Sequence, residues 1–164
     1  MASDGLLEIA DAISRIGHKD VKPLERSSLF EVDLRNFEPH TPRNGKGHKE
    51  TRKELRDAII REKGEASIED SRTLMNGKPV SVKVLFRLWR GSSNVPDTRS
   101  KKDLDNLLKP VLDVFQMYLD AQKNEPGLGL LENDIQVYEI NVRKHIVETE
   151  REEGIHINIF PFES

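Results

Sequence analysis

The chain has 164 residues, of which 34% are charged and only 5% are aromatic, and its formal net charge is −3. This length is typical of a single domain that buries a core of its own, and the scarcity of aromatic residues implies a mostly aliphatic core. Because the chain contains no cysteine, disulfide scaffolds, thiolate metal sites and cysteine nucleophiles are excluded.

The first 28 residues predict a short helix and a connector ahead of the domain proper. Leu6, Ile9, Ile13 and Ile16 recur at the spacing of one helix face. No basic segment leads into a long apolar run, so we expect no signal peptide, no membrane span and a cytoplasmic location. The domain itself is expected to cover residues 29–164.

Residues 29–75 predict a strand, a loop and a helix. Phe30, Val32 and Leu34 alternate with charged residues, which is the period of a half-buried strand. Residues 36–47 contain two prolines and two glycines and are expected to form a loop. Residues 48–63 predict a polar helix, with Thr51 and Glu54 as a capping box. Residues 65–75 are ambiguous and fit one or two further helical turns.

The second half of the chain predicts the rest of a sheet and its main helix. Residues 80–88 alternate more clearly than any other segment, and residues 104–121 carry apolar side chains at helical spacing. Residues 139–146 and 155–159 predict two further strands, which we expect to form a hairpin. This order predicts one α+β domain with a mixed four-stranded sheet packed with helices.

The charges are distributed unevenly. Residues 43–63 hold eight Lys/Arg and four Asp/Glu, residues 83–109 hold seven and three, and residues 110–164 hold four and eleven. A basic surface would therefore come from the middle of the chain, where it would suit a nucleic acid. An ordinary solvated surface of mixed charge accounts for the same counts equally well.

The candidate site centres on Asp103 and Asp105, at the point where a basic segment runs into the helical pattern. On a regular helix, residues two apart point away from each other, but at a loop-to-helix junction both side chains can lie on one side. Two carboxylates there suit a divalent metal ion, or they simply cap the helix. Lys109, one turn beyond Asp105, can pair with a carboxylate or stabilise charge on a phosphoryl oxygen.

Asp134 provides a third carboxylate, just ahead of the strand predicted from residue 139. It can lie beside the helix start if that strand pairs centrally in the sheet, or it can be an ordinary turn residue. Other chemistries lack support, because the five histidines have no zinc spacing and no phosphate-binding glycine loop or nucleophile elbow is present.

The segments Lys-Lys-Asp-Leu-Asp-Asn-Leu-Leu-Lys at 101–109 and Leu-Glu-Asn-Asp-Ile-Gln-Val at 131–137 resemble the RusA-type Holliday junction resolvases. Members of that family carry a basic residue before Asp-Leu/Ile-Asp-Asn, a following lysine, and a downstream Asp-Asp-x-Gln ahead of a strand. The resemblance covers roughly residues 79–160. It implies a RusA-like fold and a small homodimer that binds four-way DNA junctions and makes paired, symmetric nicks with Mg²⁺, or with Mn²⁺ in its place.

Carried over by position, the resemblance implies that Asp103, Asp105 and Asp134 bind the metal and that Lys109 is a catalytic lysine. It also implies that Lys102 contacts DNA. We expect four neighbouring cations to contribute to nucleic-acid binding: Arg99, Lys101, Arg143 and Lys144.

Two other functions stay open. Asn133 stands where the family has the first aspartate of its downstream pair, and the net charge is negative. Both features suit a non-catalytic nucleic-acid-binding module of the same fold. A metal-dependent nuclease acting on other branched DNA or on RNA would carry the same carboxylates.

Overall fold

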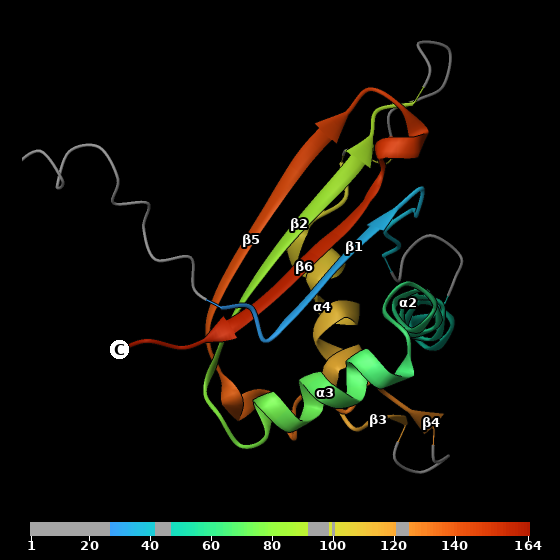
Figure 1. Ribbon diagram of the computed structural model, residues 1–164. Coiled ribbons are helices and arrows are strands. Elements are labelled where there is room, and N and C mark those ends of the chain that lie inside the picture. Colours follow the sequence, from blue (N-terminus) through green and yellow to red (C-terminus); the bar gives the residue numbers. More distant parts are fainter. Residues whose placement is uncertain (1–26, 42–46, 92–98, 100, 121–124) are drawn as a thin grey trace, which may run out of the picture.

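The computed structural model describes residues 27–41, 47–91, 99, 101–120 and 125–164. Four strands form one mixed sheet in the order β1-β6-β2-β5, with three helices packed on one side of it (Figure 1). The sheet strands are β1 (Phe30–Arg35), β2 (Val80–Trp89), β5 (Val137–Val147) and β6 (Gly154–Pro161). The helices are α2 (His48–Lys63), α3 (Glu65–Met75) and α4 (Leu104–Phe115). The prediction of one α+β domain with a mixed four-stranded sheet is confirmed.

The central strand β2 organises the sheet. It pairs antiparallel with β6 and parallel with β5, while β1 pairs antiparallel with β6 at the other edge. Val82, Val84 and Phe86 are almost completely buried, because their side chains face the helices. Alternate residues such as Lys83 face away from the helices, which is the period-two pattern that the sequence displayed.

The helices differ from expectation at their ends. α2 has the predicted bounds, but Gly47 is its N-cap and makes no side-chain hydrogen bond, so the predicted capping box of Thr51 and Glu54 is wrong. The ambiguous residues 65–75 form all of α3. The helix predicted for residues 104–121 ends at Phe115. The N-terminal helix predicted within the first 28 residues lies outside the described residues.

The early end of α4 has a clear cause in the backbone hydrogen bonds. Leu128 N donates to Val114 O over 2.8 Å, and Leu131 N donates to Phe115 O over 3.0 Å. These bonds satisfy carbonyl groups that a helix end leaves without partners. Leu128 and Leu131 are almost completely buried, so the segment after the helix both terminates α4 and contributes to the core. The short strands β3 (Tyr118–Asp120) and β4 (Glu125–Pro126) pair within this connection.

The predicted hairpin of the last two strands is wrong. β5 pairs with β2, and β6 lies on the other side of β2, so one strand separates them. The connection between Val147 and Gly154 contains a 3-10 turn at Glu150–Glu152. Six residues reach about 20 Å, which is enough to pass over one strand, since the next strand but one is about 10 Å away. The central position in the sheet belongs to β2, most of whose residues are buried.

Thr51 gives a testable consequence of this packing. Thr51 belongs to α2 and its side chain is buried in the protein. Among the described residues its hydroxyl has no hydrogen-bond partner. Thr51→Val keeps the shape and removes the unsatisfied hydroxyl, so we expect the free energy of unfolding in urea to rise by about 1 kcal/mol. The control is Thr73→Val, at an exposed residue of α3, which should change stability little. A less stable Thr51→Val protein would contradict this account.

Candidate functional site

Asp103 and Asp105 lie at the junction that the sequence predicted. Asp103 is the N-cap residue of α4, with extended backbone angles (φ −71°, ψ 140°), and Asp105 lies in the first helical turn. Both side chains are exposed. The Asp103 side chain makes no capping hydrogen bond, so capping does not account for it.

Neither aspartate has a side-chain partner among the residues that the structure describes. Within the described parts of the chain, no ion pair or side-chain hydrogen bond engages Asp103 or Asp105. Lys109 follows Asp105 by one helical turn and is also exposed, and in the same parts of the chain no salt bridge joins the two. The start of α4 thus presents two carboxylates and an ammonium group to solvent, none of them paired within the described parts of the chain.

Asp134 does not join them. Its Oδ1 accepts a hydrogen bond from Gln116 Nε2 at 2.5 Å, directly after the C-terminal end of α4. At the other end of the helix, Lys144 Nζ donates to Lys102 O at 3.2 Å. A helix of 12 residues is about 18 Å long. Asp134 therefore lies roughly one helix length from Asp103 and Asp105 in the same chain.

The topology explains this separation. β5 runs parallel to β2, and α4 connects them, so α4 must run back along the sheet from the end of β2 to the start of β5. The start of α4 then lies beside the later part of β5, and the residue ahead of β5 lies beside the end of α4. The condition for Asp134 to lie beside the helix start, a central place for its strand, is therefore not met, because β5 is an edge strand.

The separation of the carboxylates also bears on the predicted metal site. In the described ranges, no group of three or more His, Asp or Glu side chains is close enough to hold one ion. Among the described residues, Asp103, Asp105 and Asp134 of one chain therefore do not form a three-carboxylate site of the kind that Mg²⁺ or Mn²⁺ prefers. What one chain does supply is a pair of carboxylates at one end of α4 and a single carboxylate at the other.

The turn around Asp134 explains two neighbouring residues. Asn133 Oδ1 accepts from Ile135 N at 2.9 Å, so Asn133 caps the 3-10 turn Asp134–Gln136. The Gln136 side chain accepts from Glu132 N and donates to Met75 O and Lys78 O. Asparagine at 133 has a structural role here, and Gln136 fixes the turn against the end of α3.

The predicted nucleic-acid cations fall into two groups. Lys101, Arg143 and Lys144 are exposed. Lys102 is buried, with its ammonium 3.2 Å from Glu38 Oε1 and 2.6 Å from Pro39 O. Arg99 lies against the Trp89 ring, 5.2 Å from its centroid. The positions of Lys102 and Arg99 favour a structural role over contact with DNA.

Lys102 and Arg99 belong to an ionic cluster with Glu38 and Glu153, which the sequence did not predict. Arg99 bridges the two carboxylates, with Nε 3.0 Å from Glu38 and Nη1 2.9 Å from Glu153. Glu153 is almost completely buried and also accepts from Trp89 N at 2.9 Å. The cluster fixes the start of α4 against the sheet. No local pattern marks these residues, because Glu38 lies in a loop and Glu153 ends a run of charged residues.

The two carboxylates of the cluster titrate differently. Burial raises the pKa of Glu153 above its ordinary value, and the Trp89 N–H and the charge of Arg99 offset only part of the rise. Burial also acts to raise the pKa of Glu38, but the charges of Lys102 and Arg99 outweigh it and hold that pKa below its ordinary value. The ionised form of Glu38 therefore stabilises the fold through the charges of Lys102 and Arg99.

Glu38→Gln should lower the free energy of unfolding by about 2 kcal/mol at pH 7, because a charged hydrogen-bond acceptor is lost. Since the folded-state pKa of Glu38 is lowered, its contribution is fully present above its ordinary pKa and disappears as the pH falls through the lowered value. The difference between wild type and variant should therefore shrink below about pH 4. Urea unfolding at several pH values measures it, with the exposed Glu62→Gln as control. A difference that grows toward low pH would contradict this assignment.

None of the helices in the described ranges is long and apolar enough to cross a membrane. In comparisons with other proteins, no family model matches the chain, and no curated protein sequence matches it. The geometry of α4 and its neighbours therefore carries the functional argument.

Proposed function

We propose that the protein is a Mg²⁺-dependent endonuclease that cuts four-way DNA junctions by paired nicks and acts as a homodimer. Each site would combine Asp103 and Asp105 of one copy with Asp134 of a second copy. The observation that carries the proposal is the pair of exposed aspartates at the start of α4, which make neither a capping hydrogen bond nor an ion pair in the described chain. Carboxylate oxygens are the ligands that Mg²⁺ and Mn²⁺ prefer.

A second copy is needed because the carboxylates lie at opposite ends of α4. A two-fold axis that crosses α4 near its middle reverses the helix direction in the partner. The start of one α4 then faces the end of the other, where Asp134 lies. The same operation creates two equivalent sites, which suits a substrate that is itself two-fold symmetric.

An apolar strip beside α4 supports pairing at this location. Leu104, Leu108 and Leu112 share one helix face and are only partly buried. On the adjoining edge strand β5, Ile140, which pairs with the helix-facing Val82, is 43% exposed. Apolar surface of this kind is stabilised by association with a second protein surface. Residues of α4 would therefore contribute both the interface and the carboxylates.

The proposal gives the chain's own residues distinct roles. Asp103 and Asp105 would hold the metal ion, which would supply an activated water and offset charge on the leaving oxygen. Lys109, one turn away, would stabilise negative charge on a phosphoryl oxygen. The exposed cations Lys101 and Lys144 flank the start of α4 and would bind the phosphodiester backbone.

The test is incubation of the protein with end-labelled four-way junctions and MgCl₂, followed by denaturing gels that resolve each strand. The expected result is symmetric nicks in two opposed strands, with far less cutting of a linear duplex of the same sequence. Absence of product with both Mg²⁺ and Mn²⁺ would overturn the proposal. Equal cutting of the linear duplex or of an RNA strand would instead identify a nuclease of different selectivity.

A second function is favoured by one specific observation. In the described ranges a single chain has no group of three potential metal ligands, so a protein that stays monomeric would have no complete site. Such a protein would be a non-catalytic nucleic-acid-binding module. It would bind junctions in a salt-dependent way and give no product at any metal concentration.

A further inference from the structure

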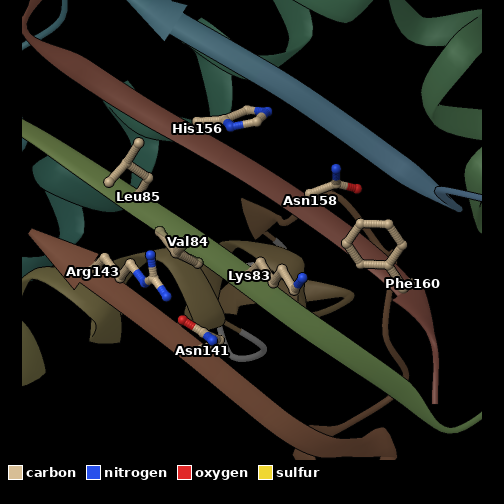
Figure 2. Close-up of a pocket in the computed structure, with 8 residues that line it drawn as sticks. All are labelled: Lys83, Val84, Leu85, Asn141, Arg143, His156, Asn158 and Phe160. Carbon is tan, nitrogen blue, oxygen red and sulfur yellow. The ribbon is translucent and has the colours of Figure 1, made fainter. Parts of the chain in front are cut away.

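The sheet face that points away from the helices carries a hollow of about 420 Å³ (Figure 2). Three neighbouring strands line it: Lys83 and Leu85 on β2, Asn141 and Arg143 on β5, and His156, Asn158 and Phe160 on β6. A volume of this size lies within the range of small-ligand sites. The helices, α4 among them, lie on the other side of the sheet (Figure 1).

The register of the strands arranges these residues in rows. Lys83 lies opposite Asn141 on one side and Asn158 on the other. Leu85 lies opposite Arg143 and His156 in the next row, and Phe160 lies in the row beyond Lys83. Successive rows on one face are about 6.7 Å apart. The first row of the hollow therefore carries the guanidinium of Arg143, and the second carries the Lys83 ammonium between two amides. The third row carries the Phe160 ring.

The charges favour an anionic ligand. The nearby carboxylates are already engaged: Glu31 contacts His156 at 2.8 Å, Asp33 contacts Arg87 at 2.5 Å, and Glu139 accepts from Ser81 at 3.0 Å. No acidic residue is among those that line the hollow. In the described chain, Arg143 has no ion pair, and the Lys83 ammonium lies over the Phe160 ring, 5.3 Å from its centroid.

We propose that this hollow binds single-stranded DNA, with a base stacked on Phe160 and phosphates held by Lys83 and Arg143. A flexible lysine over an aromatic ring can move aside for a base and bind the adjoining phosphate instead. The Asn141 and Asn158 amides present donors and acceptors to the base edge. An open sheet face that combines aromatic rings with cations is a known platform for single strands. A duplex does not offer an exposed base face to Phe160, so it would contact the cations alone.

The test measures the anisotropy of a fluorescein-labelled oligothymidylate titrated with protein in EDTA, from 50 to 300 mM NaCl. Lys83→Gln with Arg143→Gln should weaken binding about ten-fold or more at low salt. The slope of log affinity against log salt should fall by about 1.4, since each phosphate contact on a single strand contributes about 0.7. Phe160→Leu should weaken binding at least about five-fold at every salt concentration and leave the slope unchanged.

The matched control is Lys53→Gln with Arg61→Gln, which removes two exposed cations of α2 and should leave the affinity unchanged. Equal weakening by this control would show that only net charge matters and would overturn the proposal. No binding by the wild-type protein at 50 mM NaCl, or equal affinity for a duplex, would also overturn it. Because EDTA removes metal and Asp105→Asn should bind the oligonucleotide normally, failure here is distinguishable from failure of the nuclease proposal.

Discussion

Asp105→Asn is expected to lower junction cleavage by at least about 100-fold while junction affinity in the absence of metal stays within a few-fold of wild type. Asp105 is exposed in the first turn of α4 and has no partner in the described chain, so the substitution removes a proposed metal ligand without breaking a structural contact. Even a residue that only orients a ligand costs 10–100-fold in metal affinity or activity when it is removed. Binding persists because the cations that contact phosphates remain.

Asp70→Asn is the matched control, since Asp70 is an exposed aspartate of α3, remote in sequence from the proposed site. It makes the same chemical change and should leave cleavage unaltered. Single-turnover rates on the four-way junction with Mg²⁺ measure both variants. Full activity of Asp105→Asn would remove this aspartate from the site, and with it the reason for assigning a metal ion to the start of α4.

Gly154→Ala is expected to destabilise the fold severely, by about 3 kcal/mol or more. Gly154 is buried at the start of β6, where it pairs with Arg35 of β1 and Arg87 of β2. A Cβ at this position would lie 1.7 Å from Leu34 O and 3.0 Å from Arg87 Nη2. The first of these atoms belongs to the backbone of the paired strand, so β1 must move away from β6.

Urea unfolding followed by circular dichroism measures this effect. Gly47→Ser is the control, because a Cβ at Gly47 meets nothing within 4 Å and serine is a favoured N-cap residue. The control should be as stable as wild type or slightly more stable. An unchanged urea midpoint for Gly154→Ala would show that β1 is not packed against β6 as closely as described.

The sequence predicted those elements whose pattern is local. Alternation of apolar and polar residues predicts β1 and β2, and helical spacing followed by a glycine predicts the bounds of α2. Each of these elements is found within a residue or two of its predicted position. The end of α4 was harder to predict because the apolar spacing continues to Tyr118. The hydrogen bonds from residues 127–131 end the helix, and no pattern within the helix reports on them.

Strand order could not be predicted in the same way. β5 and β6 follow each other closely and both alternate, so a hairpin was the simplest pairing. The tertiary arrangement instead puts β2, whose residues are the most buried, between them. This one difference moves Asp134 to the far end of α4, because a strand parallel to β2 must begin where α4 ends. The local motifs identified the start of α4 and the turn ahead of β5, but not the distance between the two ends of the helix.

The buried ionic cluster shows the same limit. Lys102 has the sequence context of a DNA-binding cation, yet its ammonium contacts Glu38, which lies 64 residues away in sequence. Glu153 contacts Arg99 across 54 residues. Only the folded chain brings these charges together. Arg143 is different, because it lies on an exposed edge strand and its solvent-facing position followed from alternation alone.

The central claim is that each site takes Asp103 and Asp105 from one copy and Asp134 from the other. The most direct measurement uses heterodimers, co-expressed with two different tags and purified through both. In a heterodimer of Asp105→Asn with Asp134→Asn, one shared site keeps all three aspartates and the other loses two. Each variant alone should be inactive.

The shared-site account predicts that this heterodimer nicks one strand of the junction at about half the wild-type rate per dimer. It also predicts that wild type paired with an Asp105→Asn, Asp134→Asn double variant is inactive, because both shared sites then lack one aspartate. The reverse pattern, an inactive first heterodimer and an active second one, would contradict the account and assign all three aspartates to a single chain.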